Sequence, residues 1–190
     1  MGLAADYLTA LEANIEAVAR QERDGLRAAA DMIVEAQRGG RKAYEYLAGH
    51  LMPIEAAVGR RGRPEVLLSL KDGETDRLEP GDVLVMTHQY GVHESYVNVA
   101  IAAKARGARI IAIAPPSDPA RIVRSHPTGT WVGDYAERVI STHIPEGDVA
   151  LTAPEGGPGS CPTSGAIQAL MHWMLVCELA ERHALNPTGG

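Results

Sequence analysis

The sequence predicts an α/β fold in which helices cover both faces of a parallel β-sheet. From residue 41 onward, short apolar runs alternate with stretches of helical pattern, the order expected of βαβ units. Two of these runs, residues 83–86 and 110–114, are continuously apolar, which is typical of strands buried on both faces. The helix expected over residues 94–106 ends at Gly107 and leads directly into the second run, which indicates a right-handed crossover between parallel neighbours.

The chain begins with a helical segment over residues 6–38. Its apolar positions are spaced by three, four and three residues: Leu8, Leu11, Ile15 and Val18. The spacing breaks at Glu22 and Gly25 and resumes one position later, so the segment forms either two helices or one kinked helix. An apolar stripe outside any βα unit often packs on a partner subunit. We therefore expect residues 1–40 to pack on a domain formed by residues 41–190 and on a second copy of the chain.

The remaining elements follow from shorter patterns. Further apolar runs that could form strands are residues 41–48, 64–70, 137–144 and 148–153. Helices are expected over residues 50–60 and from Thr163 to about His183. Residues 115–135 are too rich in proline and glycine for a helix, and they are long enough to form a flap or an interface arm.

Composition excludes several classes of function. The net charge is −6, with no cationic cluster of the kind that nucleic-acid binding requires. No run of 18 apolar residues is present to span a membrane, and the acidic N-terminus does not resemble a signal peptide. Cys161 and Cys177 form neither a disulfide framework nor a zinc knuckle. We expect a cytoplasmic protein with a small-molecule ligand.

The predicted fold indicates where that ligand binds. Open doubly wound sheets bind ligands at the carboxyl ends of their strands, at the point where the strand order reverses. Three segments meet this condition: residues 48–50, 87–94 and 154–165. The second reads THQYGVHE, and it is unusual because it carries large polar side chains with a single glycine.

The chain resembles a sugar isomerase (SIS) domain over nearly its whole length. The similar segments are RGGRKAYEYLAGH (38–50), GDVLVMTHQYG (81–91), AAKARGARIIAIA (102–114), HPTG (126–129), THIPEGDVAL (142–151) and PTS (162–164). More narrowly, it is similar to small single-domain SIS proteins of poorly defined function, which are related to phosphoheptose isomerases. The resemblance implies a three-layer αβα sandwich with a five-stranded parallel sheet of flavodoxin- or Rossmann-like topology, assembled as a homodimer or homotetramer.

The resemblance also implies a sugar-phosphate ligand, which SIS domains either isomerise through an enediol or sense without reaction. Related proteins hold the phosphate with a Ser-Asn-Ser-Gly loop, and His88, Gln89, Tyr90 and Gly91 stand at those positions here. A second loop of the type Gly-x-Gly-His-Ser keeps Gly49 and His50 but loses its serine. A phosphate would then rely on backbone donors and on a protonated His88 or His93. A neutral sugar, a carboxylate or a sulfonate would fit the changed loop equally well.

Candidate catalytic residues follow from the same resemblance. In the phosphoheptose branch a glutamate on the helix after the first loop acts as base, and Glu55 lies there, although a solvated glutamate is an equal alternative. The last helix of that branch presents a glutamine, matched by Gln168, and a histidine whose position holds Val176 here. His172, one turn after Gln168, could substitute, or it could simply pack in the core. His88 is the third candidate proton carrier.

The full ligand-binding set that we predict is Gly49, His50, Gln89, Tyr90, Gly91, His93, Glu94, His126, Ser164 and Gln168. His88, His93 and Glu94 could alternatively hold a divalent metal such as zinc, although we expect no obligatory cofactor. The leading hypothesis is a sugar isomerase of the aldose–ketose type. The alternatives are a non-catalytic sugar-binding or regulatory module and a metal-dependent epimerase or lyase.

Overall fold

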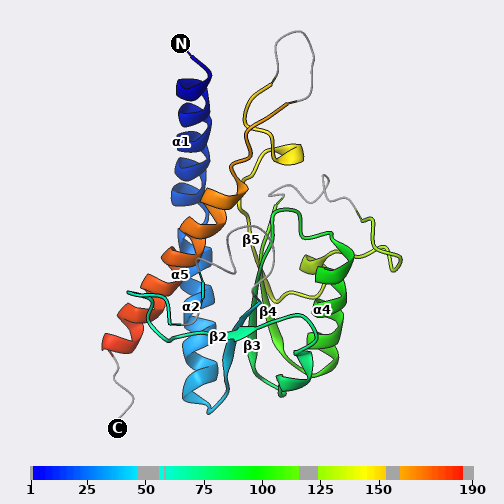
Figure 1. Cartoon of the computed structure of the whole chain (residues 1–190). Coiled ribbons are helices and arrows are strands. Elements are labelled where there is room, and N and C mark those ends of the chain that lie inside the picture. Colours follow the sequence, from blue (N-terminus) through cyan, green and yellow to red (C-terminus); the bar gives the residue numbers. More distant parts are fainter. Residues whose placement is uncertain (1, 47–55, 58, 116–123, 153–158, 186–190) are drawn as a thin grey trace.

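The predicted parallel sheet is present and has five strands. The computed structural model describes residues 2–46, 56–57, 59–115, 124–152 and 159–185 (Figure 1). The strands are β1 (Ala43–Tyr46), β2 (Leu68–Leu70), β3 (Val83–Thr87), β4 (Arg109–Ile113) and β5 (Arg138–Ile140). All neighbours pair in parallel, in the order β2-β1-β3-β4-β5. This confirms the α/β fold class.

The described residues form four long helices: α1 (Leu3–Gln21), α2 (Arg23–Arg38), α4 (Glu94–Ala105) and α5 (Ser164–Leu185). Short 3-10 turns lie at η1 (Thr75–Arg77), η3 (Val132–Asp134) and η4 (Glu146–Asp148). The N-terminal segment is therefore two helices, separated at Glu22, and α2 continues below α1 in Figure 1. Among the described residues, no helix is long and apolar enough to cross a membrane.

The two faces of the sheet are buried by different helices. On one face, Val83, Val85 and Ile111 join the core that α2 and α5 cover. On the other face, Leu84 and Ile110 join the core that α4 covers. Because consecutive strand residues point to opposite faces, a continuously apolar strand serves both cores. The result is the predicted three-layer sandwich.

The structure differs from the sequence prediction after β5. This strand ends at Ile140, and three residues later His143 adopts a left-handed backbone conformation with φ of 52°. Asn14 of α1 donates a hydrogen bond to the His143 carbonyl, and Glu22 accepts one from the His143 ring, at 2.8 Å. Residues 148–152 form no strand of the sheet, and Leu151 makes only an isolated antiparallel bridge with Ser160. Most of the helix expected over residues 50–60 lies outside the described residues.

Candidate functional site

The strand order reverses between β1 and β3, at their carboxyl ends. From β1 the chain passes to β2 on one side, and it then returns to form β3 on the other side of β1. The connections therefore leave the sheet in opposite directions at this point, which is where open α/β sheets bind ligands. Of the three predicted loops, the one after β3 is described, the one before α5 is described in part, and residues 48–50 are not described.

His88 organises the loop that follows β3. Its side chain is buried, and its Nδ1 accepts hydrogen bonds from the backbone N–H groups of Tyr90, at 3.1 Å, and Gly91, at 3.0 Å. Nδ1 is therefore the unprotonated nitrogen of the ring. The imidazole also packs on the Tyr96 ring, with 4.0 Å between centroids. Two N–H groups that could meet a phosphate are thus satisfied within the loop.

The other three residues of this loop have distinct surroundings. Gly91 is buried with φ of +65°, and a Cβ atom there would lie 3.0 Å from Val132 Cγ1 and 3.1 Å from Ala114 Cβ. The Gln89 Oε1 atom is buried without a hydrogen-bond partner among the described residues. Tyr90 is 39% exposed, and partial burial, followed by the charge of Asp148, raises the pKa of its phenol. Gly91 is thus required for packing, while Gln89 and Tyr90 are available to a ligand.

His93 and Glu94 lie at the start of α4 and are exposed. His93 Nδ1 is 2.9 Å from Ser95 Oγ, and the ring centroids of His88 and His93 are 6.2 Å apart. Within the described part of the chain, no three or more His, Cys, Asp or Glu side chains are grouped so as to hold a metal ion. The metal site built on these residues stays a prediction.

His126 fastens the predicted flap to α4. Its Nδ1 accepts the Thr128 N–H at 3.2 Å, so its Nε2 carries the proton and donates to Asn98 Oδ1, also at 3.2 Å. The flap also contacts the loop after β3, because the Val132 N–H donates to the Gly91 carbonyl at 3.0 Å. His126 is buried and has a structural task that the sequence did not reveal. Its predicted role in ligand binding stays a prediction.

Three polar residues lie along one face of α5. Ser164, Gln168 and His172 are spaced by four residues and are at most 1% exposed. Ser164 Oγ, both Gln168 amide atoms and His172 Nε2 are buried without a hydrogen-bond partner among the described residues. We refer to these three side chains as the α5 polar row. The row begins directly after the exposed residues 159–162.

Asp148 fixes the start of this helix. Its Oδ1 accepts the backbone N–H groups of Thr163, at 3.2 Å, and Ser164, at 3.1 Å. A carboxylate at this position satisfies two N–H groups that have no partner within the helix and complements the positive end of the helix dipole. The Ser164 hydroxyl is therefore not needed for capping.

Glu45 is the site residue that sequence reasoning missed. It lies in β1, is 1% exposed, and its Oε1 is 2.8 Å from His172 Nδ1. Its other oxygen has no hydrogen-bond partner among the described residues. The signal was an acidic residue inside an otherwise apolar strand, RKAYEYLA, because an acidic side chain is seldom fully buried unless it is paired. Glu55, Gly49 and His50 lie outside the described residues, so their roles stay predictions.

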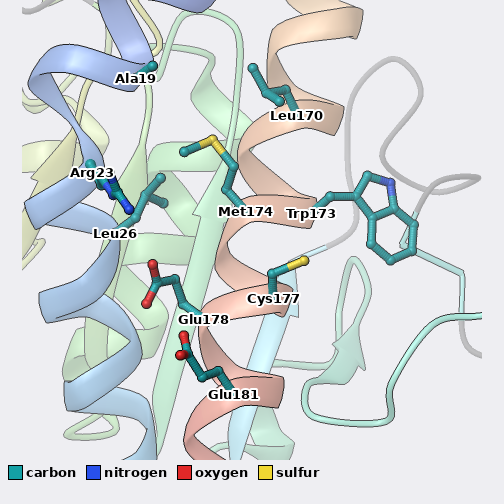
Figure 2. Close-up of a pocket in the computed structure, with 9 residues that line it drawn as sticks. All are labelled: Ala19, Arg23, Leu26, Leu170, Trp173, Met174, Cys177, Glu178 and Glu181. Atoms are coloured by element: carbon teal, nitrogen blue, oxygen red, sulfur yellow. The ribbon is translucent and has the colours of Figure 1, made fainter.

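A separate groove of about 490 Å³ lies on the outer side of the helical layer (Figure 2). The side chains that line it come from α1, α2 and α5 and include Leu26, Trp173 and Glu178. None of the predicted site residues lines this groove. The candidate site at the strand ends therefore rests on its buried polar atoms, not on the size of an open groove.

The chain has relatives of similar sequence. No protein-family model matches the chain. In sequence it is 24% identical to a UPF0309 protein of Streptomyces coelicolor, over 88% of this chain and 78% of that protein. It is 28% identical to a UPF0309 protein of Geobacillus kaustophilus, over 85% and 74% of the two chains.

Several solved structures share the fold of this chain. A candidate phosphosugar isomerase involved in capsule formation from Bacteroides fragilis has a TM-score of 0.63 at 19% identity, covering 96% of this chain and 92% of that one. Vibrio vulnificus NanR complexed with ManNAc-6P has a TM-score of 0.63 at 11% identity, with 97% and 64% covered. The E. coli protein c3406 in complex with A5P has a TM-score of 0.63 at 12% identity, with 95% and 89% covered. The chain thus has the fold of the SIS-type phosphosugar isomerases and is similar in sequence to the UPF0309 proteins.

Proposed function

We propose that the protein binds a sugar phosphate, or a sugar with another anionic group, at the carboxyl ends of β1 and β3 and isomerises it between aldose and ketose forms. The observation that carries this proposal is the α5 polar row. Each buried polar atom without a partner costs about 1–3 kcal/mol, so these side chains are expected to meet hydrogen-bonding groups of a ligand or of water. The hydroxyl groups along the carbon chain of a single sugar supply both donors and acceptors at short, regular spacing. They could therefore meet a hydroxyl, an amide and an imidazole that lie in a row.

The reaction needs a group that removes a proton next to a carbonyl and returns it to the neighbouring carbon. His172 is the described residue best suited to this task, because one ring nitrogen is held by Glu45 and the other is unpartnered among the described residues. Glu55 and His88 remain the other predicted proton carriers. His88 would act as a neutral imidazole, since its Nδ1 accepts two N–H groups.

The proposal that the ligand carries an anionic group rests on proteins of the same fold. NanR and c3406, which have this fold, are complexed with ManNAc-6P and A5P. In the present chain the usual serines are absent and His88 occupies the N–H groups of Tyr90 and Gly91. A phosphate must therefore displace the His88 ring or use other donors. This favours sugars whose anionic group contributes less to affinity than in relatives with a serine-rich loop.

The second candidate function is a non-catalytic sugar-binding or regulatory module. The loop after β3 favours the binding module, because two of its N–H groups already bind His88. A loop that only recognises a ligand does not need to present reactive groups. A homodimer or homotetramer would suit either function, and this assembly stays a prediction.

Two measurements on the purified chain test and separate these functions. Thermal shifts with pentose and hexose phosphates, compared with the same sugars without phosphate, report binding, and a ligand at 100 times its Kd should add about 2.7 kcal/mol of stability. Incorporation of deuterium from D2O next to the sugar carbonyl, followed by NMR, reports enediol chemistry. Stabilisation with exchange supports the isomerase, and stabilisation without exchange supports the binding module. If no sugar in the panel stabilises the protein, both functions are wrong.

A further inference from the structure

We infer that Glu45 is a positioning residue that holds the His172 imidazole with its proton on Nδ1, so that Nε2 is the atom that accepts and returns a proton. The inference concerns a pair of residues from β1 and α5 that are 127 positions apart in the chain. Its catalytic meaning rests on the proposed isomerase function, but its structural content can be tested without any substrate.

The geometry assigns the proton. A carboxylate has only acceptor atoms, so Glu45 accepts in the 2.8 Å contact and His172 Nδ1–H is the donor. This holds whether the imidazole is neutral or charged. Nε2 is then the only ring atom whose protonation changes, as in other sites where a carboxylate orients a histidine base.

Burial indicates that the pair has a role beyond stability. Both side chains are at most 1% exposed, and an ionisable pair at such a position loses hydration that its mutual attraction only partly restores. The pair also leaves Glu45 Oε2 and His172 Nε2 without partners among the described residues. A pair that served only to join β1 to α5 would be expected to satisfy these atoms or to be replaced by apolar side chains.

The side chains near His172 on the same helix face could hydrogen-bond to the hydroxyl groups of a sugar. One turn earlier on the same helix face lies Gln168, whose donor and acceptor are both unpartnered among the described residues, and one turn before that lies the Ser164 hydroxyl. A linear sugar that hydrogen-bonds to Ser164 and Gln168 would bring its next carbon atoms toward His172. The α5 polar row would therefore bind the open-chain form of the sugar.

The proton transfer balances without any added reactant. Nε2 takes the proton from the carbon next to the carbonyl, the electron pair of that C–H bond becomes the C=C bond of the enediol, and the π electrons of the C=O bond move to its oxygen. The former carbonyl oxygen receives the hydroxyl proton of the neighbouring carbon, which becomes the new carbonyl. The Nε2 proton then returns to the adjacent carbon, and the imidazole is restored.

The test compares Glu45→Gln with a matched control, Asp82→Asn. Asp82 is another carboxylate at 1% exposure, but it lies just before β3, at the amino end of this strand, where it accepts the N–H groups of Lys42 and Glu79. Both variants lose a buried charge, so both should lower the melting temperature. Only Glu45→Gln should alter His172.

The first readout is the histidine tautomer from ¹⁵N NMR of the free protein. We expect His172 to carry its proton on Nδ1 in the native protein and in Asp82→Asn, and to shift toward the Nε2–H form in Glu45→Gln. A native protein with the proton on Nε2, or a tautomer that does not respond to Glu45→Gln, would overturn the inference. The native spectrum alone decides the first point, should Glu45→Gln fail to fold.

The second readout is the solvent-exchange rate of a sugar phosphate that the native protein turns over. Glu45→Gln should lower kcat by roughly 10²- to 10⁴-fold with a nearly unchanged KM, because the orientation of the base is lost while the binding groups remain. It should have no further effect in a His172→Gln background, since Glu45 acts through His172. Additive losses would contradict the inference. If the tautomer behaves as expected but no sugar exchanges, Glu45 still positions His172 and the isomerase proposal is what fails.

Discussion

His88 changes what the loop after β3 can bind. The sequence places a histidine where related proteins carry a phosphate-binding serine, and the natural expectation is a cation that replaces a hydroxyl. The ring is instead buried, and its Nδ1 accepts two backbone N–H groups of its own loop. A single side chain thus completes the turn and occupies its donors.

Replacing His88 with alanine tests this function of the ring. The N–H groups of Tyr90 and Gly91 would lose their acceptor, and each lost hydrogen bond is worth about 0.5–1.5 kcal/mol. We expect both amides to exchange hydrogen roughly tenfold faster, as measured by NMR. His93→Ala is the control, because that ring is exposed and contacts Ser95. Unchanged exchange in His88→Ala would show that the ring does not hold the loop.

Gly91→Ala tests the packing of the same turn. The new methyl group would lie 3.0 Å from Val132 and 3.1 Å from Ala114, in addition to the cost of a left-handed conformation. Gly73→Ala is a matched control, since Gly73 also has a positive φ but has no atom within 4 Å of the added Cβ. We expect a loss of about 1 kcal/mol for the control and about 2–4 kcal/mol for Gly91→Ala in urea unfolding. Equal losses would mean that the turn tolerates the methyl group.

At the scale of elements, the flap and α5 are held to the rest of the domain by different interactions. The flap is joined to α4 by the polar contact between His126 and Asn98, and Arg124 pairs with Asp134 of η3 within the flap. Helix α5 is fastened by apolar packing against α2 and the sheet, with Asp148 at its start. The Arg124–Asp134 pair is therefore expected to make the flap respond to pH.

Asp134 provides the pH test. Burial raises the pKa of its carboxyl, but hydrogen bonds from Arg124 and the Trp131 N–H, together with the Arg124 charge, lower it on balance. A lowered pKa in the folded state gives stability that is present above the unfolded value, about 3.9, and is lost as the pH falls through the folded value. We expect Asp134→Asn to lower the melting temperature at pH 7, and the difference from the native protein to shrink below about pH 4. The exposed Asp24→Asn serves as control; a Tm difference for Asp134→Asn that stays constant into acid would contradict the assignment.

At the scale of the whole molecule, α1 has one face on the domain and one face exposed. Val18 is buried, whereas Leu3, Leu8 and Ile15 are 65%, 53% and 40% exposed. The predicted homodimer or homotetramer would bury this stripe. Light scattering of the native protein should then report an assembly, and Leu8→Lys should shift it toward the monomer because a buried lysine is costly. Leu68→Lys, on the edge strand β2, is the control; a native monomer at tens of micromolar would contradict the expected assembly.

Sequence patterns predicted the frame of this molecule better than its site. Strands β3 and β4 were evident because continuous apolar runs are what burial on both faces requires. The end of β5 was not, because His143 is held in its turn by Asn14 and Glu22, far away in the sequence. Glu45 was overlooked for the same reason, since its partner on α5 is visible only after folding. Local patterns specify elements, whereas polar pairs between distant elements depend on the assembled fold.

The most direct test of the proposed site is where a sugar phosphate binds. Titration of the isotope-labelled protein with ManNAc-6P and A5P can be followed at the Gln168 side-chain amide and the His172 ring by NMR. Binding at the strand ends predicts that both signals shift with saturation, while the Met174 methyl group, which lines the outer groove, stays unchanged. Shifts confined to the Met174 methyl group, or no shifts with either ligand at millimolar concentration, would contradict the site at the carboxyl ends of β1 and β3.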